Sequence, residues 1–396
     1  MSNIEIQHTR IALWVTTGYP WSADWVQGVF HQTAVRALQH AGVSVRVAAV
    51  VPRTPWPLPL VNTRWARYAA VPPEYVDSGI PIIRPRYLAV PGLPSWSRPE
   101  RSIANAVLGS LGHSADVGLV HSHYAFPMAP AGRAIARRLH VPHVVTVHGD
   151  DINTWPAEHP RQLPGVVAAL LAADALVAVS DALAERTAAV CGRRPETIPI
   201  GIDIEAFTRS LPDRSSARAQ LGIDDGRFVA LYVGLLSRAK GSYLFADAVN
   251  ASPKDVLGVV IGEGPGAGYG TDAGRRRLRY VGVQPRAGVA LYMRAADVVV
   301  LPSQNEGLPT VLVEAGAVGT PVIASRAGGI PELLADGRGV VVDELTAAAF
   351  SAAVCDAIVD PGALLQRSRS LQAHVRTEYD AGMNARRLAA IYGRLM

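Results

Sequence analysis

The chain has 396 residues, of which 49% are hydrophobic and 18% charged, and this length is enough for two domains of ordinary size. The formal net charge of +5 is not gathered into a basic stripe, which argues against a nucleic-acid-binding protein. No apolar run reaches the ~18–20 residues of a membrane span and the N-terminus lacks the apolar core of a signal peptide, so we expect a cytoplasmic protein.

The chain begins with a pattern typical of a βαβ unit. Residues 11–17 read as a buried strand, residues 29–41 as an amphipathic helix and residues 43–50 as a second strand. We therefore expect a parallel sheet with a right-handed crossover. A long loop from Gly18 to Gly28 opens at the carboxyl end of the first strand, where doubly wound sheets bind ligands.

Residues 51–100 contain many prolines and little helical periodicity, so we expect an irregular stretch there. All seven tryptophans lie at or before Trp155, and Trp56, Trp65 and Trp96 fall in this stretch. Because tryptophan stacks on sugar rings and also fills cores, these side chains either line an acceptor site or pack in the interior.

Histidines and acids gather at the ends of the next two expected strands. Residues 117–122 form a strand ending near His121 and His123, and residues 142–147 form another that ends in His148, Asp150 and Asp151, with a helix at 131–139 between them. Such groups can suggest a metal site. We expect none, because no two ligands share helical spacing, and Cys191 and Cys355 lack metal-ligand spacing too.

A second domain begins after the segment IPIGID at 198–203. Its expected strands are 228–233, 256–261, 278–281, 298–301, 321–324 and 340–342, and helical segments at 346–359, 362–379 and 383–395 close the chain. A basic cluster at residues 275–279 is either a solvated face or a contact for an anion or membrane surface. Lys240 and Lys254 are the only lysines among 38 lysines and arginines. A lysine at position 240 therefore indicates that a compact ammonium group is needed there.

The segment 297–334 carries the strongest chemical signal. An apolar run ends at Pro302, a polar turn leads through Gly307 and Pro309, and a helix follows. Free amides at that helix start, with the helix dipole, favour an anion such as a diphosphate. Glu306 lies in the loop, and Glu314 lies about one turn into the helix on a face that can address the same ligand.

The pattern PSxxEGxPxxxxEAxAxGxPVIAxxxGGxxE resembles family 4 of the retaining glycosyltransferases, which have the GT-B fold. The segments HGDD at 148–151, IPIGID at 198–203, GLLSRAKG at 234–241 and GEGP at 262–265 resemble other motifs of that family, with Ile200 and Leu235 in place of the usual asparagine and arginine. The resemblance implies two doubly wound Rossmann-like domains facing across a cleft. It implies an acceptor-binding domain at 1–205, a nucleotide-sugar-binding domain at 206–376, and a C-terminal helix, 377–396, that crosses back to the first domain.

The resemblance also implies roles for individual residues. His148 faces the transferred sugar, Glu306 contacts its hydroxyls or the positive charge developing at the anomeric carbon, and Lys240 holds the diphosphate. The remaining donor-binding candidates are Gly18, Gly28, Arg238, Gly264, Val283, Asn305, Gly307, Leu308, Pro309, Thr310 and Glu314. The acceptor-binding candidates are Trp21, His123, Asp150 and Asp151.

The implied reaction transfers a hexose-type sugar from a UDP- or GDP-sugar with retention, without metal or cofactor. The acceptor attacks on the face that the diphosphate leaves, and the leaving phosphate takes its proton. A cell-surface polysaccharide or lipid-linked acceptor is our first interpretation, and a small natural-product or thiol-precursor acceptor is the alternative. A nucleotide-sugar epimerase of the same fold and an inactive sugar-nucleotide-binding protein stay open. The sequence does not indicate the base, the sugar, the linkage or the oligomeric state.

Overall fold

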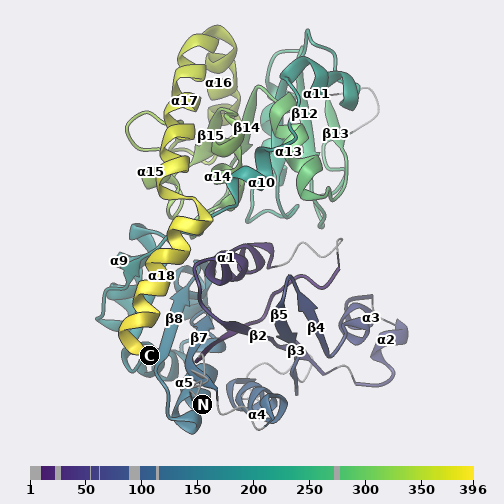
Figure 1. Cartoon of the computed structure of the whole chain (residues 1–396). Coiled ribbons are helices and arrows are strands. Elements are labelled where there is room, and N and C mark those ends of the chain that lie inside the picture. The colour runs from purple at the N-terminus through teal and green to yellow at the C-terminus, as the bar shows by residue number, and fades with distance from the viewer. Residues whose placement is uncertain are drawn as a thin grey trace, which may run out of the picture. The chain divides into compact units, whose positions relative to one another are not determined.

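The computed structural model describes residues 10–22, 28–53, 55–61, 63–88, 99–112, 116–271 and 277–396 (Figure 1). The chain divides into two compact units. The first comprises residues 1–179, 183–198 and 382–396, and the second comprises residues 180–182 and 199–381. The unit boundaries fall at 198/199 and 381/382, beside the expected 205/206 and 376/377.

The first unit is built on an eight-stranded sheet in the order β10-β9-β8-β7-β1-β2-β5-β4. All pairs are parallel except β4 with β5. The strands are β1 (Ile11–Thr16), β2 (Val45–Ala49), β4 (Glu74–Asp77), β5 (Ile80–Ile83), β7 (Val117–His123), β8 (His143–Val147), β9 (Ala175–Ala178) and β10 (Glu196–Thr197), and β3 (Val51–Pro52) pairs with β6 (Arg86–Tyr87) outside it.

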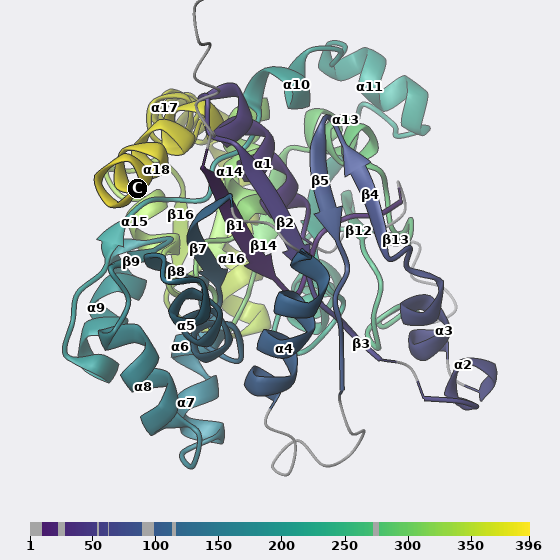
Figure 2. The ribbon, with the colours of Figure 1, turned by 60° about the horizontal axis from the view of Figure 1, so that its bottom comes forward.

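Helices cover both faces of this sheet, so its central strands are buried on both sides. One face packs against α1 and α18, and the other against α4 and α5, which Figure 2 shows lying over the strands. The helices of the unit are α1 (Val29–His40), α2 (Leu58–Val61), α3 (Thr63–Ala70), α4 (Pro99–Leu111), α5 (Met128–Leu139), α6 (Asp150–Asn153), α7 (Trp155–Glu158), α8 (Leu163–Leu171), α9 (Asp181–Cys191) and α18 (Ala381–Leu395).

The expectation of an irregular stretch at 51–100 was wrong for much of its length. It contains α2, α3 and the β4–β5 hairpin, and β5 extends the main sheet by pairing with β2. Each of these elements is short, and prolines such as Pro81 lie inside them. Tertiary pairing with β2 therefore decides the conformation of this segment, and local periodicity does not.

The second unit is built on a six-stranded parallel sheet in the order β13-β12-β11-β14-β15-β16. This is the Rossmann order, and the direction in which successive strands are added across the sheet reverses between β11 and β14, where such sheets bind ligands. The strands are β11 (Phe228–Val233), β12 (Val256–Ile261), β13 (Leu278–Tyr280), β14 (Val298–Leu301), β15 (Val322–Ser325) and β16 (Val340–Val342). The helices are α10 (Ile204–Thr208), α11 (Arg214–Leu221), α12 (Ser242–Ala251), α13 (Arg286–Ala295), α14 (Thr310–Val318), α15 (Ile330–Leu333), α16 (Ala347–Val359) and α17 (Pro361–Glu378).

The expected fold class is confirmed: the chain is α/β, with parallel sheets in two Rossmann-like domains. β11, β12, β14 and β16 have the bounds expected from their β-branched runs. In the part of the chain that the structure describes, no one helix combines the length and hydropathy of a membrane span; α16 and α17 reach those values only as a pair, with a 101° bend between them.

Candidate active site

Lys240 and Glu306 meet at the switch point of the second unit. Lys240 follows β11, Glu306 follows β14, and the Lys240 Nζ lies 3.0 Å from the Glu306 Oε1. The ammonium also donates a hydrogen bond to the carbonyl oxygen of Asn305 at 3.2 Å. The Glu306 side chain is 11% exposed and that of Lys240 is 30% exposed, so the pair is partly shielded from water. The two residues that the sequence placed in one site lie together.

Backbone contacts between the two loops hold this pair in place. The N–H of Gln304 donates to the carbonyl of Ala239 at 2.9 Å. Gly241 adopts a positive φ of 76°, and a Cβ there would lie 1.9 Å from the carbonyl oxygen of Pro302, so the close approach needs glycine. The Tyr232 hydroxyl donates a hydrogen bond shared between the carbonyl oxygens of Leu235 and Lys240. This contact stabilises the turn at residues 235–240.

Two helices begin beside these loops with open N-termini. α14 starts at Thr310 after Pro309, and α12 starts at Ser242 after Gly241. Neither helix has an acidic residue in its first turn, and no side chain in the described ranges caps either one. The amides and the helix dipoles together favour a bound anion. Leu308 is buried, and the carbonyl of Gly307 accepts the N–H of Gly329 at 2.8 Å.

Glu314 lies in the second turn of α14 and contacts a residue that the sequence reasoning missed. Its Oε1 lies 3.5 Å from the Arg286 Nη2, and its side chain is 17% exposed. Burial raises the pKa of the Glu314 carboxyl to about 7, although Arg286 opposes that rise.

The other donor-site candidates on this unit are less close to one another. The Arg238 guanidinium lies 4.7 Å from the centroid of the Tyr243 ring. Gly264 packs against the carbonyl of Leu236, Val283 is 40% exposed in the loop before α13, and Leu235 is 56% exposed.

The first unit gathers imidazoles at its own switch point, between β1 and β7. His123 at the end of β7 bonds through Nδ1 to the Nε2 of His148, 3.0 Å away, and its ring stacks on Trp14 at 3.8 Å between centroids. His31 on α1 joins them, with its Nε2 2.8 Å from the Thr16 hydroxyl. His121 points elsewhere and bonds Thr146 and the Tyr392 hydroxyl.

Burial keeps these imidazoles neutral. It lowers the pKa of His148 to about 3, and it lowers the pKa values of His31, His121 and His123 well below the usual range. The ring nitrogens of His148 can therefore donate or accept a hydrogen bond near neutral pH without carrying charge.

Three of these histidines have a geometry that could hold a metal ion. One ligand atom from each of His31, His123 and His148 lies within 4.8 Å of the others. His123 and His148 already share a hydrogen bond, so a metal that used those two nitrogens would have to replace it. Neutral imidazoles suit zinc, and the hydrogen-bonded arrangement accounts for the same contacts.

The two aspartates after His148 differ in their surroundings. Asp151 is buried and accepts hydrogen bonds from the backbone amides of Ala125, His148 and Gly149. Its carboxylate thus fixes the loop that carries His148. Asp150, at the start of α6, is exposed.

Gly28 and Gly18 touch each other where the first loop returns to α1. Gly28 has a φ of 82°, and a Cβ there would lie 2.4 Å from the carbonyl carbon of Gly18. The contact therefore requires glycine at position 28. Trp21, between them, is half-buried, and residues 23–27 of this loop lie outside the described residues.

The tryptophans of residues 51–100 and the arginines of residues 275–279 differ in their surroundings. Trp56 is 78% exposed, so core packing does not explain it, and Trp65 is partly buried. Trp96, Arg275 and Arg276 lie outside the described residues. Arg277 and Arg279 donate to backbone carbonyls of Ser252 and Leu221, so these two members of the basic cluster have structural partners.

His31 and Arg286 are the site residues that sequence reasoning missed. His31 is the third residue of α1, three positions after Gly28, and Arg286 is the first residue of α13. A signal was present for His31, because the first turn after a glycine loop lies at the ligand edge of such a sheet. No motif in the sequence pointed to Arg286.

Comparison with known proteins agrees with this architecture. The model of Glycosyltransferase Family 4 matches residues 27–206, and that of Glycosyl transferases group 1 matches residues 213–373. A putative teichuronic acid biosynthesis glycosyltransferase, TuaC of Bacillus subtilis, is 33% identical over 383 residues, which cover 95% of this chain and 96% of that protein. D-inositol 3-phosphate glycosyltransferase 1 of Catenulispora acidiphila is 30% identical over 85% of this chain and 83% of its own length.

Solved structures share the fold. Sucrose-phosphate synthase of Thermosynechococcus elongatus superposes with a TM-score of 0.77 at 21% identity, covering 98% of each chain. HepE of Anabaena in complex with UDP superposes with a TM-score of 0.73 at 20% identity, covering 98% of this chain and 100% of HepE. The chain belongs to glycosyltransferase family 4, and it is a glycosyltransferase with the GT-B fold.

Proposed function

We propose that this glycosyltransferase takes a hexose-type sugar from a nucleoside diphosphate sugar bound on the second unit. The observation that carries the proposal is the Lys240–Glu306 pair at 3.0 Å, beside the open N-termini of α12 and α14. A cation and two helix starts suit a diphosphate without a metal ion.

The donor residues take distinct roles in this proposal. Lys240 and the amides at Thr310 hold the diphosphate, Glu314 accepts hydrogen bonds from the ribose hydroxyls, and Glu306 stabilises positive charge at the anomeric carbon. Asn305, Gly307, Leu308 and Pro309 shape the backbone around the sugar. Gly264 and Val283 lie where the nucleotide can pack, and Arg238 is a reserve phosphate contact.

We assign the acceptor to the first unit. His148 hydrogen-bonds the transferred sugar, while His123, Asp150 and Trp21 line the acceptor side. Gly18 and Gly28 form a compact turn in this unit, and we propose that its backbone contacts the donor. Asp151 acts indirectly in this assignment, because its oxygens already accept backbone amides.

We further propose that transfer proceeds with retention of the anomeric configuration. A histidine with a pKa of about 3 is a weak base near neutral pH, so His148 is poorly suited to take the acceptor's proton. The leaving phosphate oxygen is then the better base. That route requires the acceptor to attack on the face that the diphosphate leaves.

The reaction is proposed to need no metal or other cofactor. An enzyme stripped with a chelator should retain full activity, and added Mg²⁺ or Zn²⁺ should not raise it. Loss of activity on chelation, restored by Zn²⁺ in the wild type but not in a His31→Ala variant, would instead assign a metal to the imidazoles.

The acceptor is proposed to be a cell-surface polysaccharide or lipid-linked glycan, and the reaction to take place in the cytoplasm, with contact at the inner membrane face. Support comes from TuaC, which this chain matches along 96% of its length. A small polar acceptor is the second candidate, favoured by the inositol phosphate glycosyltransferases among the relatives.

The proposal is tested by incubating the protein with UDP- and GDP-sugars and candidate acceptors, after thermal-shift screening of the nucleotides. Acceptor-dependent nucleotide release, with an anomeric carbon of unchanged configuration by NMR, is the expected result. A changed sugar that stays nucleotide-linked would identify an epimerase. Nucleotide binding without turnover would identify an inactive binding protein.

A further inference from the structure

Arg286 lies outside the sequence motifs of the family, yet its guanidinium contacts Glu314, one of the two glutamates of the proposed donor site. Its Nη2 lies 3.5 Å from Oε1 of Glu314. Within the described residues no other group bonds this carboxylate, so Oε2 is available to a ligand hydroxyl. The contact orients Glu314 without using all of its acceptor capacity.

The Arg286 guanidinium also packs on the ring of Phe207. Its Cζ lies 5.2 Å from the centroid of the Phe207 ring on α10, which is buried, and the Arg286 side chain keeps 38% exposure. A guanidinium on an aromatic face is a favourable and directional contact. Arg286 is thus placed by Phe207 as well as by Glu314.

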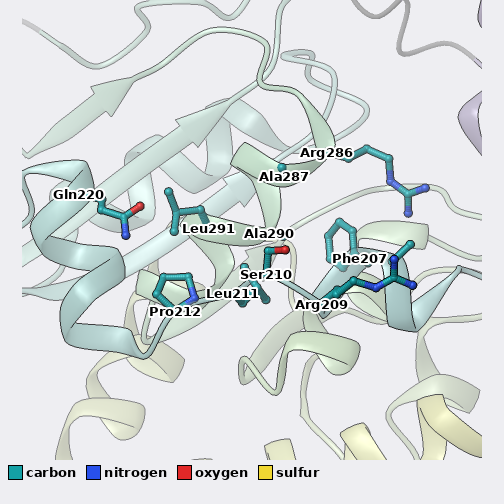
Figure 3. Close-up of a pocket in the computed structure, with 11 residues that line it drawn as sticks. Phe207, Arg209, Ser210, Leu211, Pro212, Gln220, Arg286, Ala287, Ala290 and Leu291 are labelled. Carbon is teal, nitrogen blue, oxygen red and sulfur yellow. The ribbon is translucent and has the colours of Figure 1, made fainter.

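The other side of Arg286 faces a pocket of about 740 Å³ on the second unit. Figure 3 shows Arg286, Arg209 and Phe207 at one end of this pocket, and Gln220, Pro212 and Leu291 at the other. Arg209 pairs with the exposed Glu205 one turn earlier, at 3.0 Å, and not with Glu314. Of the two arginines that line the pocket, Arg286 contacts Glu314 and the Phe207 ring, whereas Arg209 pairs with Glu205.

We propose that Arg286 is a positioning residue of the donor site, which holds the Glu314 side chain ionised and oriented for the ribose hydroxyls of the nucleotide. The inference rests on the proposed function, since it takes Glu314 to be the ribose contact. Arg286 does not touch the reacting atoms in this account, and it acts only through Glu314.

The charge on Glu314 makes the role measurable. With its pKa near 7, this carboxyl is only partly ionised at neutral pH, and Arg286 is the cation that favours the ionised form. Among described residues no other charged group comes within ion-pair distance of it. The elements packed against α14 also carry Glu205, Tyr292, Arg294, Arg367, Arg369, His374, Arg376 and Glu378.

The test compares wild type with Arg286→Gln, Arg286→Lys and the control Arg209→Gln by calorimetric binding of UDP and GDP between pH 6 and pH 9. In the wild type, affinity should fall as the pH drops through about 7, as Glu314 takes up its proton. Arg286→Gln should move this midpoint upward by about one pH unit and weaken binding about fivefold at pH 7, with little effect at pH 9. Arg286→Lys should recover part of the loss, and Arg209→Gln should match the wild type.

A 2′-deoxynucleoside diphosphate separates this role from general destabilisation. This ligand lacks the 2′-hydroxyl, from which Glu314 would accept a hydrogen bond. The difference in affinity between wild type and Arg286→Gln should therefore be smaller for this ligand than for UDP or GDP. An equal gap with both ligands, an unshifted midpoint, or tighter binding by Arg286→Gln would overturn the inference. Tighter binding would mean that Arg286 competes with the ribose.

The same experiment distinguishes failure of the proposed function from failure of the inference about Arg286. If the wild type binds neither UDP nor GDP, the donor assignment and the inference fall together. If the wild type binds and Arg286→Gln behaves identically, only the inference falls. Titration of the Glu314 side chain by carbon-13 NMR in the free protein reports the midpoint without any ligand, and it should rise in Arg286→Gln.

Discussion

At the scale of single residues, the proposed donor site of the free protein contains two pairs of opposite charges. Lys240 pairs with Glu306, and Arg286 pairs with Glu314. A diphosphate is a stronger partner for the Lys240 ammonium than one carboxylate, because it offers more negative oxygens. Binding of the donor would then free the Glu306 carboxylate to face the sugar.

Replacing Glu306 separates binding from chemistry. We expect Glu306→Gln to lower turnover on the order of 10²–10³-fold, as loss of a charge-stabilising group does. Nucleoside diphosphate affinity should stay equal or increase, because Lys240 loses a competing partner. Calorimetry and initial-rate assays measure both, with the exposed Glu205→Gln as control. Unchanged turnover would contradict the role of Glu306.

The buried histidines predict how stability depends on pH. Burial lowers the pKa of His143 to about 4 and of His148 to about 3, whereas an unfolded histidine has a pKa of about 6.5. Below that value the unfolded state binds protons that the folded state does not, so the free energy of unfolding must fall with pH. The fall continues down to the folded pKa values.

Each such histidine contributes up to about 1.4 kcal/mol per pH unit in this window. We expect urea midpoints to drop steeply from pH 7 to pH 5. His143→Gln keeps an amide within reach of the Ser122 hydroxyl, which His143 bonds at 2.9 Å, and removes one titrating group. The slope should therefore be smaller in this variant, and equal slopes would refute the explanation.

At the scale of elements, the candidate residues of each unit are brought together by loops that follow neighbouring strands on either side of a switch point. In the second unit these are the loops after β11 and β14, joined by the hydrogen bond from Gln304 to Ala239. In the first unit they follow β1, β7 and β8. Parallel strands bring their carboxyl ends to one edge, so residues far apart in sequence become neighbours.

The turn before α12 is the element most sensitive to an added methyl group. Gly241→Ala should cost about 1 kcal/mol for the left-handed backbone and ~1–3 kcal/mol more for the clash with Pro302. Gly222→Ala, at the end of α11, has a φ of 60° but open space around the new Cβ, so only the first cost applies. Denaturant unfolding and UDP binding compare the two; equal effects would contradict the close approach.

At the scale of the whole molecule, the C-terminal helix completes the core of the first unit. Leu388, Ile391 and Tyr392 of α18 pack with α1 and the central strands. The Tyr392 hydroxyl lies 2.5 Å from the Nδ1 of His121. The last 15 residues, 382–396, therefore belong to the unit formed by the beginning of the chain.

Truncating a single side chain of α18 tests this. Ile391 is 1% exposed, so Ile391→Ala should lower the free energy of unfolding by ~2–5 kcal/mol. Arg386→Ala on the exposed side of the same helix should change it by less than ~0.5 kcal/mol. If both variants unfold like the wild type, α18 does not contribute to the core.

The sequence predicted what depends on local pattern and missed what depends on tertiary contacts. Buried β-branched runs predicted β11, β12, β14 and β16, and motif spacing brought Lys240 and Glu306 to one site. Nothing local indicates that the Asp151 carboxylate accepts three backbone amides, or that Arg286 reaches Glu314 from another helix. β5 was missed because its strand identity comes from pairing with β2.

The central claim is that a nucleoside diphosphate binds where Lys240 meets the start of α14. Calorimetric titration of UDP and GDP into wild type, Lys240→Ala and Lys254→Ala tests it most directly. Lys254 is the only other lysine and is exposed, so it controls for loss of charge. Removing one charged hydrogen-bond donor should weaken binding about 10–100-fold in Lys240→Ala, whereas Lys254→Ala should bind like the wild type. Equal affinity of all three proteins would contradict the account.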